Sequence, residues 1–102
     1  MLIDGITSDV LPASDRGLAY GDGLFETIRL SHGQPLFLAE HLERLQQGCL
    51  RLRIAPDMEQ IAQWLEAACA SAPASAVLKL IVTRGSGGRG YQVPADAHPR
   101  CI

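Results

Sequence analysis

The sequence predicts an α+β domain in which two helices cover one face of a largely antiparallel sheet. Stretches typical of β-strands come first in the chain, two amphipathic helical stretches follow, and a strongly strand-like stretch comes after them. The chain has 102 residues, enough for one small domain with a modest core. Of these residues 47% are hydrophobic and 20% are charged, which is ordinary for a globular protein and unlike a disordered one.

Short strands and turns are expected in the N-terminal part of the chain. Residues 2–6 and about 9–11 are short strand candidates, and turn-forming residues are dense over 12–23. The stretch 24–31 is rich in β-branched and apolar residues, which favours a strand. A short hairpin turn at 32–34 is expected to follow it.

A first helix is predicted over 38–53. It follows residues 35–37, into which the hairpin turn at 32–34 leads. Apolar residues recur there at steps of four and three, which places them on one face of a helix. They are Leu38, Leu42, Leu45, Cys49 and Leu52. The helix is expected to end before Pro56, because the residue preceding a proline avoids the α region.

A second helix is predicted over 57–70, with the following residues on its buried face: Met58, Ile61, Ala62, Leu65, Ala68 and Cys69. Residues 76–84 then form the most strand-like stretch of the chain, and a glycine-rich run occupies 85–90. Residues 100–102 resemble the beginning of another strand, so we expect the chain to be part of a longer one.

Charge and cysteine content exclude several classes of protein. The net charge of −2 argues against a domain that binds nucleic acid through a basic surface. No apolar run approaches the about 18 residues of a membrane helix, and the N-terminus lacks the features of a signal peptide, so we expect a cytoplasmic protein. Cys49 and Cys69 fall on the apolar helix faces and are interpreted as core thiols, and no metal site is expected at His32 or His98.

The glycine-rich run matches the pattern G-x-G-x-x-G, but its context does not fit a dinucleotide site. No helical pattern follows it, and Pro94 would break a helix there. Two interpretations remain open. The run is either a flexible connection between strands or a loop that presents Arg84, Arg89 and Tyr91 to an anionic substrate.

Arg44 and Glu26 are charged residues on predicted elements, and their surroundings in the sequence leave their roles open. Arg44 lies off the apolar face of the first helix, where an ordinary surface pair with Glu40 is the simplest reading. Gly48, one turn later, either admits a neighbour beside the Arg44 guanidinium or allows close helix packing. Glu26 shares its strand face with apolar residues, so this carboxylate is either buried with a partner or half-exposed. Asp22 is interpreted as a turn residue.

Three stretches together resemble the N-terminal domain of the fold-type IV pyridoxal-phosphate enzymes. They are DRGLAYGDGLFETIRL (15–30), HLERL (41–45) and TRGSGGRGY (83–91). This family includes D-amino-acid and branched-chain aminotransferases and 4-amino-4-deoxychorismate lyase, and RGSGGRGY is most similar to the lyase members. The resemblance covers essentially the whole chain and implies pyridoxal 5'-phosphate as the cofactor.

The resemblance also implies a role for individual residues. Arg44 matches the arginine that holds the cofactor phosphate, a role that suits a planar guanidinium. Arg89 and Tyr91 match loop positions that meet the substrate carboxylate, with Arg84 as a second candidate for that role. Phe25 matches a position where related enzymes have a substrate-facing tyrosine, so a polar contact from this position is not expected here. The segment 20–23 is interpreted as scaffold.

No catalytic residue is expected within residues 1–102. The family's Schiff-base lysine lies further along the chain in a second domain, and Lys79, the only lysine here, does not match its position. The resemblance therefore implies an N-terminal domain, inactive alone, of a homodimeric lyase that eliminates pyruvate from 4-amino-4-deoxychorismate, with no nucleic-acid or membrane partner. The alternatives are an aminotransferase of the D-amino-acid or branched-chain type and a non-catalytic module that binds anions.

Overall fold

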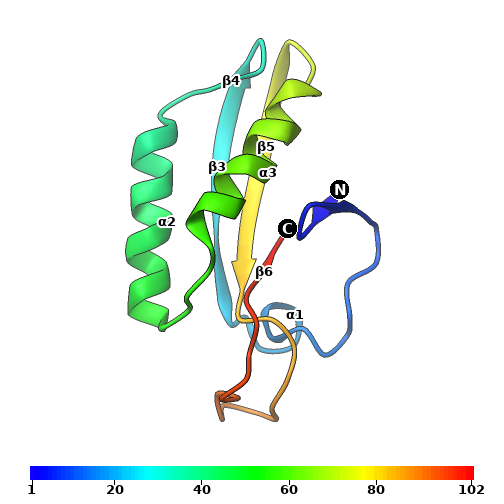
Figure 1. Cartoon of the computed structure of the whole chain (residues 1–102), viewed down its shortest axis with the longest axis vertical. Coiled ribbons are helices and arrows are strands. Elements are labelled where there is room, and N and C mark those ends of the chain that lie inside the picture. The colour runs from blue at the N-terminus through cyan, green and yellow to red at the C-terminus, as the bar shows by residue number, and fades with distance from the viewer.

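The computed structural model describes residues 1–102 and is built around a four-stranded antiparallel sheet (Figure 1). Its strand order is β4-β3-β5-β6. The two central strands are long, β3 over Gly23–Ser31 and β5 over Ser75–Thr83, and the outer strands are short, β4 over Gln34–Pro35 and β6 over Arg100–Cys101. The predicted α+β fold class with an antiparallel sheet is confirmed.

The pairing of β3 with β5 sets which side chains face the core. The two strands are in register from Gly23 opposite Thr83 to Ser31 opposite Ser75. Because side chains alternate along a strand, Glu26, Ile28 and Leu30 are buried while their neighbours in β3 are exposed. The predicted strand at 24–31 therefore has one buried face and one bare face.

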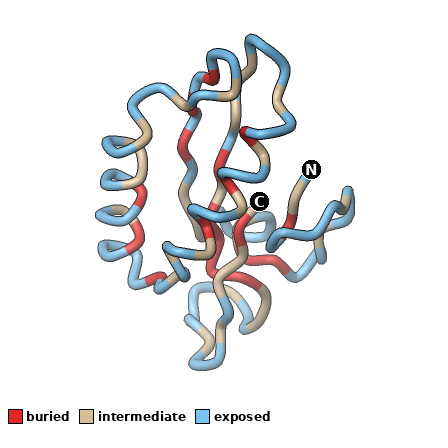
Figure 2. Tube along the Cα trace, turned by 45° about the horizontal axis from the view of Figure 1, so that its top comes forward, coloured by how far each residue is buried: buried red, intermediate tan, exposed pale blue.

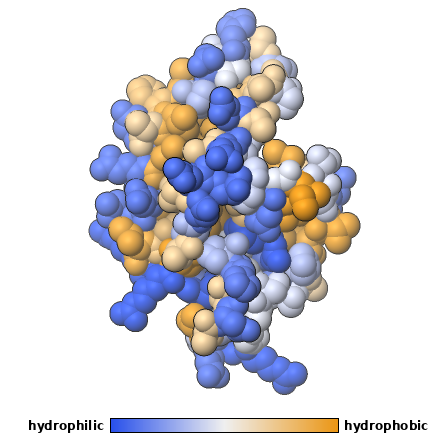
Figure 3. Space-filling view, viewed as in Figure 1, coloured by the Kyte–Doolittle hydropathy of each residue, from blue (hydrophilic) through white to orange (hydrophobic).

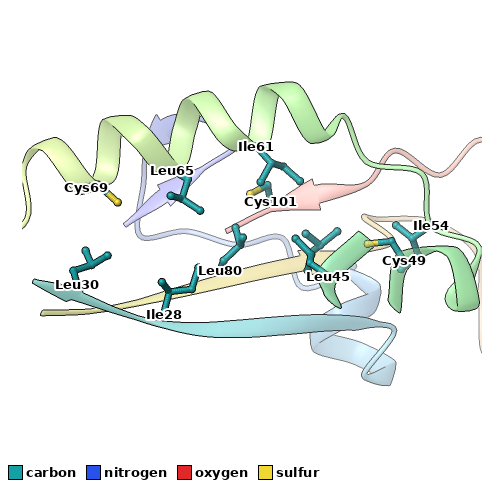
Figure 4. Close-up of a cluster of buried hydrophobic side chains, with 11 residues drawn as sticks. Ile28, Leu30, Leu45, Cys49, Ile54, Ile61, Leu65, Cys69, Leu80 and Cys101 are labelled. Atoms are coloured by element: carbon teal, nitrogen blue, oxygen red, sulfur yellow. The ribbon is translucent and has the colours of Figure 1, made fainter. Parts of the chain in front are cut away.

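Helices α2 (Leu38–Leu52) and α3 (Met58–Ala70) cover the buried face of the sheet. Figure 4 shows α3 above the two long strands, with the side chains of both helices pointing into one cluster between the layers. The centre of this cluster holds Ile28, Leu45 and Ile61, each exposed by no more than 1%. Figure 2 shows the same arrangement, with buried segments along the strands and the inner sides of the helices.

Local hydrogen bonds and backbone geometry explain where the two helices begin and end. The Asp57 side chain accepts from the Gln60 N–H, 3.0 Å away, and caps the start of α3. Arg53 has a left-handed backbone with φ 55°, and its N–H bonds the last carbonyls of α2. Both helices agree with the sequence prediction to within one residue at each end.

The N-terminal part of the chain differs from the prediction. A hairpin of β1 (Leu2–Ile3) and β2 (Ile6–Thr7) replaces the strand expected over 2–6, and residues 9–11 form no strand. The segment expected to hold only turns contains the short helix α1 (Arg16–Tyr20). The Asp15 carboxylate caps α1 by accepting hydrogen bonds from the N–H groups of Gly17 and Leu18 in its first turn.

The cysteines are buried, which confirms the interpretation of Cys49 and Cys69 as core thiols. Burial raises the pKa of both thiols, and it raises the pKa of Cys101 to about 11, with a further contribution from the charge of Asp4. All three are free.

The outer surface over the helices is mostly hydrophilic, with separate apolar side chains between the polar ones (Figure 3). None of the helices combines the length and the apolar character needed to cross a bilayer.

Candidate functional site

A cluster of three charged or titratable side chains joins α2 to β3. The Glu26 carboxylate accepts two hydrogen bonds from Arg44, from Nε at 2.7 Å and from Nη2 at 2.6 Å. The same carboxylate lies 2.6 Å from Nδ1 of His41, one turn before Arg44 on the helix. Glu26 is 4% exposed, so the arginine reaches inward to a buried partner. This result decides between the two interpretations of Glu26.

The contacts between Glu26 and Arg44 stabilise the charged form of both side chains. The hydrogen bonds from Arg44 are the main reason that the pKa of Glu26 is below its ordinary value, although burial opposes the shift and His41 adds to it. In return, Glu26 raises the pKa of the Arg44 guanidinium. A two-pronged arginine–carboxylate pair fixes the plane of the guanidinium as well as its position.

The rest of the Arg44 guanidinium is available to a ligand. The side chain is 71% exposed, and its Nη1 group has no partner within the protein. A surface pair with Glu40, the simplest sequence interpretation, is not formed. Gly48 lies against Leu24, whose Cδ1 would be 2.5 Å from an added Cβ, so this glycine serves helix–strand packing.

The glycine-rich stretch begins in the core and ends at the surface. Arg84 is buried and directs its guanidinium inward. Its Nε donates to Asp22 at 2.8 Å, and its Nη1 and Nη2 donate to the carbonyls of Arg53 and Leu52 at 3.0 and 2.8 Å. This placement differs from the expectation that Arg84 faces a substrate, because its three nitrogens already bond Asp22 and the C-terminal end of α2.

The other two residues proposed for the loop are open to solvent. Arg89 is exposed, and Tyr91 is 96% exposed. Neither side chain makes a hydrogen bond or an ion pair within the chain. Both are therefore free to meet a ligand that approaches the end of the sheet where β5 leads into the loop.

Phe25 lies on the bare face of the sheet and is 59% exposed. It borders a hollow of about 360 Å3 between α1 and the sheet, which Ile81 and Leu18 also line. The Nζ atom of Lys79 lies 4.7 Å from the centroid of the Phe25 ring. Arg44 and Phe25 thus occupy different sides of β3, and the chain alone does not close one pocket around all the predicted site residues.

Two buried residues next to the loop, Asp15 and Arg16, were assigned no role in the sequence analysis. Asp15, fully buried, accepts from Thr83 Oγ1 at 2.9 Å and pairs with Arg100. Arg16, 2% exposed, donates to Asp22 and to two carbonyls of the loop. The Asp-Arg pair before Gly17 begins one of the three stretches that carry the family resemblance, but the pattern of turn-forming residues around it indicated no ion-pair role for either residue.

Comparison with known proteins shows to which protein family this chain belongs. The family model of amino-transferase class IV matches residues 23–102, which include β3, both long helices and the glycine-rich loop. The chain belongs to the aminotransferase class IV family. The resemblance drawn from the three sequence stretches is thereby confirmed at the level of the family.

Individual members of the class IV family support this assignment. An aminodeoxychorismate lyase from Vibrio harveyi is 36% identical over 90 residues, which span 87% of this chain and 33% of the relative. The crystal structure of a 4-amino-4-deoxychorismate lyase from Pseudomonas aeruginosa is 52% identical, with a TM-score of 0.91 over 97% of this chain and 36% of that one. A hypothetical aminotransferase from Mycobacterium tuberculosis, in a PLP-bound form, is 28% identical with a TM-score of 0.76, covering 92% of this chain and 32% of that one. The chain thus spans about a third of the length of these relatives.

The residues present fit one part of a cofactor site of the class IV type. A phosphate dianion needs fixed N–H donors, and Arg44 offers an unpartnered Nη1 on a guanidinium whose plane is set by Glu26. No group of three or more His, Cys, Asp or Glu side chains is arranged to hold a metal ion. The exposed Nη1 of Arg44 is thus a donor whose chemistry suits an anionic group such as a phosphate.

Proposed function

We propose that residues 1–102 form the N-terminal domain of a pyridoxal-phosphate-dependent 4-amino-4-deoxychorismate lyase. The observation that carries the proposal is the 52% identity to a lyase of that name over 97% of the chain, together with the same backbone fold. The lyase eliminates pyruvate from 4-amino-4-deoxychorismate and leaves 4-aminobenzoate. When bound, pyridoxal phosphate supplies an electron sink for this elimination.

In this proposal Arg44 binds the phosphate group of the cofactor. Glu26 holds the guanidinium through Nε and Nη2, so that Nη1 faces outward to the phosphate. Two charged hydrogen bonds to a buried carboxylate limit the side-chain freedom that phosphate binding would otherwise have to remove. Arg44 is therefore ordered before the ligand arrives.

Arg89 and Tyr91 are proposed to bind a carboxylate of the substrate. Both lie exposed on the glycine-rich loop and have no partner in the chain. Phe25 contributes an apolar surface on the bare sheet face, without the hydroxyl that a tyrosine would offer. Arg84 is not included in the substrate site, because its guanidinium bonds the interior.

The remaining parts of the active site are proposed to come from outside these residues. The lysine that binds the cofactor covalently is placed beyond residue 102, and Lys79 is not assigned this role, because it packs over Phe25 on the sheet. A homodimer in the cytoplasm and a small-molecule substrate complete the proposal. Residues 1–102 alone are expected to be inactive.

A pyruvate assay tests the proposal on the polypeptide encoded by the complete gene. Incubation with 4-amino-4-deoxychorismate and pyridoxal phosphate should release pyruvate without any amino acceptor. Arg44→Ala should weaken cofactor binding more than tenfold, and Arg89→Ala should lower kcat/KM with cofactor binding unchanged. Arg51→Ala, at an exposed position on the same helix as Arg44, is the matched control and should change neither.

An aminotransferase is the second candidate, favoured by the 28% identity to the hypothetical aminotransferase from Mycobacterium tuberculosis. If the protein is an aminotransferase, it would convert the cofactor to its amine form with an amino acid such as D-alanine. It would then release no pyruvate from 4-amino-4-deoxychorismate. If the polypeptide does neither and binds no pyridoxal phosphate, a non-catalytic module that binds anions is the remaining reading.

A further inference from the structure

Arg16 connects two sequence stretches that lie far apart in the chain. It is the first residue of α1, and its backbone N–H donates to the carbonyl of Gly85, 2.8 Å away, at the start of the glycine-rich loop. Its side chain runs into the loop and is 3% exposed. Figure 1 shows α1 beside the end of β5, where the loop departs from the sheet.

Each part of the Arg16 guanidinium has its own partner. Nε donates to Asp22 at 2.9 Å, Nη1 to the carbonyl of Gly87 at 3.3 Å, and Nη2 to the carbonyl of Gly90 at 2.9 Å. The two carbonyls stand on either side of Gly88 and Arg89, the exposed turn of the loop. The guanidinium therefore fixes both ends of the segment that carries Arg89.

Tyr20 adds a third fixed point from the last residue of α1. Its hydroxyl accepts a hydrogen bond from the N–H of Gly90 at 2.9 Å. Its ring lies under the guanidinium of Arg16, with Cζ 4.8 Å from the ring centroid. Gly90 is thus held through its carbonyl by Arg16 and through its N–H by Tyr20.

We propose that Arg16 is a positioning residue that fixes the glycine-rich loop and thereby presents Arg89 to the substrate carboxylate. This inference rests on the proposed function for the role of Arg89. The contacts of Arg16 with the loop are independent of it.

The loop needs such an external constraint because its own backbone provides little. Gly87, Gly88 and Gly90 have φ values of 128°, 68° and 58°, in a backbone region that residues other than glycine rarely adopt. A run of glycines has many accessible conformations, and ordering it on substrate binding would cost affinity. Three hydrogen bonds from α1 select one conformation before the substrate arrives.

Asp22 allows the arginine to stay buried. Its carboxylate accepts from Arg84 and from Arg16, and these bonds hold its pKa below the ordinary value even though burial opposes the shift. The charge on Arg16 is therefore compensated, and its two Nη groups are left for the loop carbonyls. Arg84 uses the same carboxylate to hold the end of α2, the helix that carries Arg44.

The test compares Arg16→Lys and Tyr20→Phe with wild type in the polypeptide encoded by the complete gene, loaded with pyridoxal phosphate. A lysine keeps the charge opposite Asp22 but cannot donate in three fixed directions. Tyr20→Phe removes only the acceptor of the Gly90 N–H from a side chain that is 45% exposed, so the fold is retained. Arg51→Lys, exposed on α2, is the control.

Two readouts separate positioning from general stability. Hydrogen exchange of the segment 86–91 should become at least about fivefold faster in Tyr20→Phe, the loss expected for one net hydrogen bond, and faster still in Arg16→Lys. KM for 4-amino-4-deoxychorismate should rise at least tenfold in Arg16→Lys, with kcat and the cofactor affinity within twofold of wild type. A purely structural role would instead lower the amount of active enzyme and leave KM unchanged.

Unchanged exchange of 86–91 in Tyr20→Phe would overturn the proposal, as would a wild-type KM in a folded Arg16→Lys. If Arg16→Lys does not fold, Tyr20→Phe decides alone, through a KM increase of about threefold or its absence. If the wild-type polypeptide releases no pyruvate, the lyase proposal fails, while the exchange measurement still reports whether Arg16 and Tyr20 fix the loop.

Discussion

Replacing Asp22 by asparagine removes the charge that two buried arginines share. Arg16 and Arg84 both donate to the same carboxylate oxygen, at 2.9 and 2.8 Å, and their side chains are only 3% and 9% exposed. Asparagine has the same shape but one acceptor oxygen and no charge. Asp22→Asn therefore leaves two guanidinium groups without a countercharge in the interior.

The structure sets the size of the expected effect. Removing one partner of a buried ion pair costs about 3–5 kcal/mol, and the amide oxygen that remains places Asp22→Asn near the lower end, at about 3 kcal/mol. For a domain of this size that loss lowers Tm by about 12–24 °C. The effect is larger than for an exposed pair, which contributes about 0–1 kcal/mol.

The effect must also depend on pH. The pKa of Asp22 is lowered in the folded protein from a reference value of 3.8, mainly by the hydrogen bond from Arg84. A lowered folded pKa contributes stability that is present above 3.8 and is lost as the pH falls through the folded pKa. The stability difference between wild type and Asp22→Asn should therefore be fully present at pH 7. It should shrink as the pH falls below 3.8 and through the lowered pKa of the folded protein.

Chemical denaturation followed by circular dichroism measures this difference in the free energy of unfolding, once at pH 7 and once at an acidic pH below 3.8. Asp9→Asn is the matched control, since the Asp9 side chain is 90% exposed and meets only the N-terminal amine at 3.4 Å. It should change the free energy of unfolding by no more than about 0.5 kcal/mol. An Asp22→Asn variant as stable as this control at pH 7 would show that Asp22 does not compensate the charges of the two arginines.

Three further predictions concern the core. Ile28→Ala, at a fully buried position facing the helices, should lower the free energy of unfolding by about 2–5 kcal/mol in guanidinium denaturation, and a loss below about 1 kcal/mol would contradict the described packing. Gly23→Ala would place a Cβ 2.6 Å from the carbonyl oxygen of Val82, so it should destabilise the β3–β5 pairing by at least about 1 kcal/mol, which thermal unfolding checks. The buried Cys101 thiol, whose pKa is raised to about 11, should react with a thiol reagent at pH 8 at least tenfold more slowly in the native protein than in urea, and equal rates would count against its burial.

The central layer of the fold could be predicted because its signals are local and periodic. The apolar spacing through Leu45 and Cys49 marks α2 to within one residue of its end, and alternation marks the buried face of β3. The short helix α1 could not be predicted in the same way. It has five residues and is capped by Asp15, whose carboxylate also accepts from Thr83, a strand residue distant in the sequence.

The candidate site was predictable in its residue types but less so in its contacts. Arg44 bonds Glu26 on the adjacent strand β3 instead of Glu40 on its own helix, because a buried carboxylate requires a charged partner more than an exposed one does. Arg84 and Arg89 looked alike in the sequence, yet the first turns inward to Asp22 and the second outward to solvent. The partners that hold Arg84 inward, Asp22 and the C-terminal end of α2, are distant from it in the sequence, so no local pattern separates the two arginines.

Whether Arg44 binds the phosphate of a cofactor held by a lysine outside this domain can be tested by borohydride reduction of the complete gene product loaded with pyridoxal phosphate, followed by peptide mapping in a mass spectrometer. We expect one stoichiometric adduct on a lysine outside residues 1–102, with occupancy strongly reduced in Arg44→Ala at limiting cofactor. A stoichiometric adduct on Lys79, or occupancy that does not depend on Arg44, would contradict this expectation.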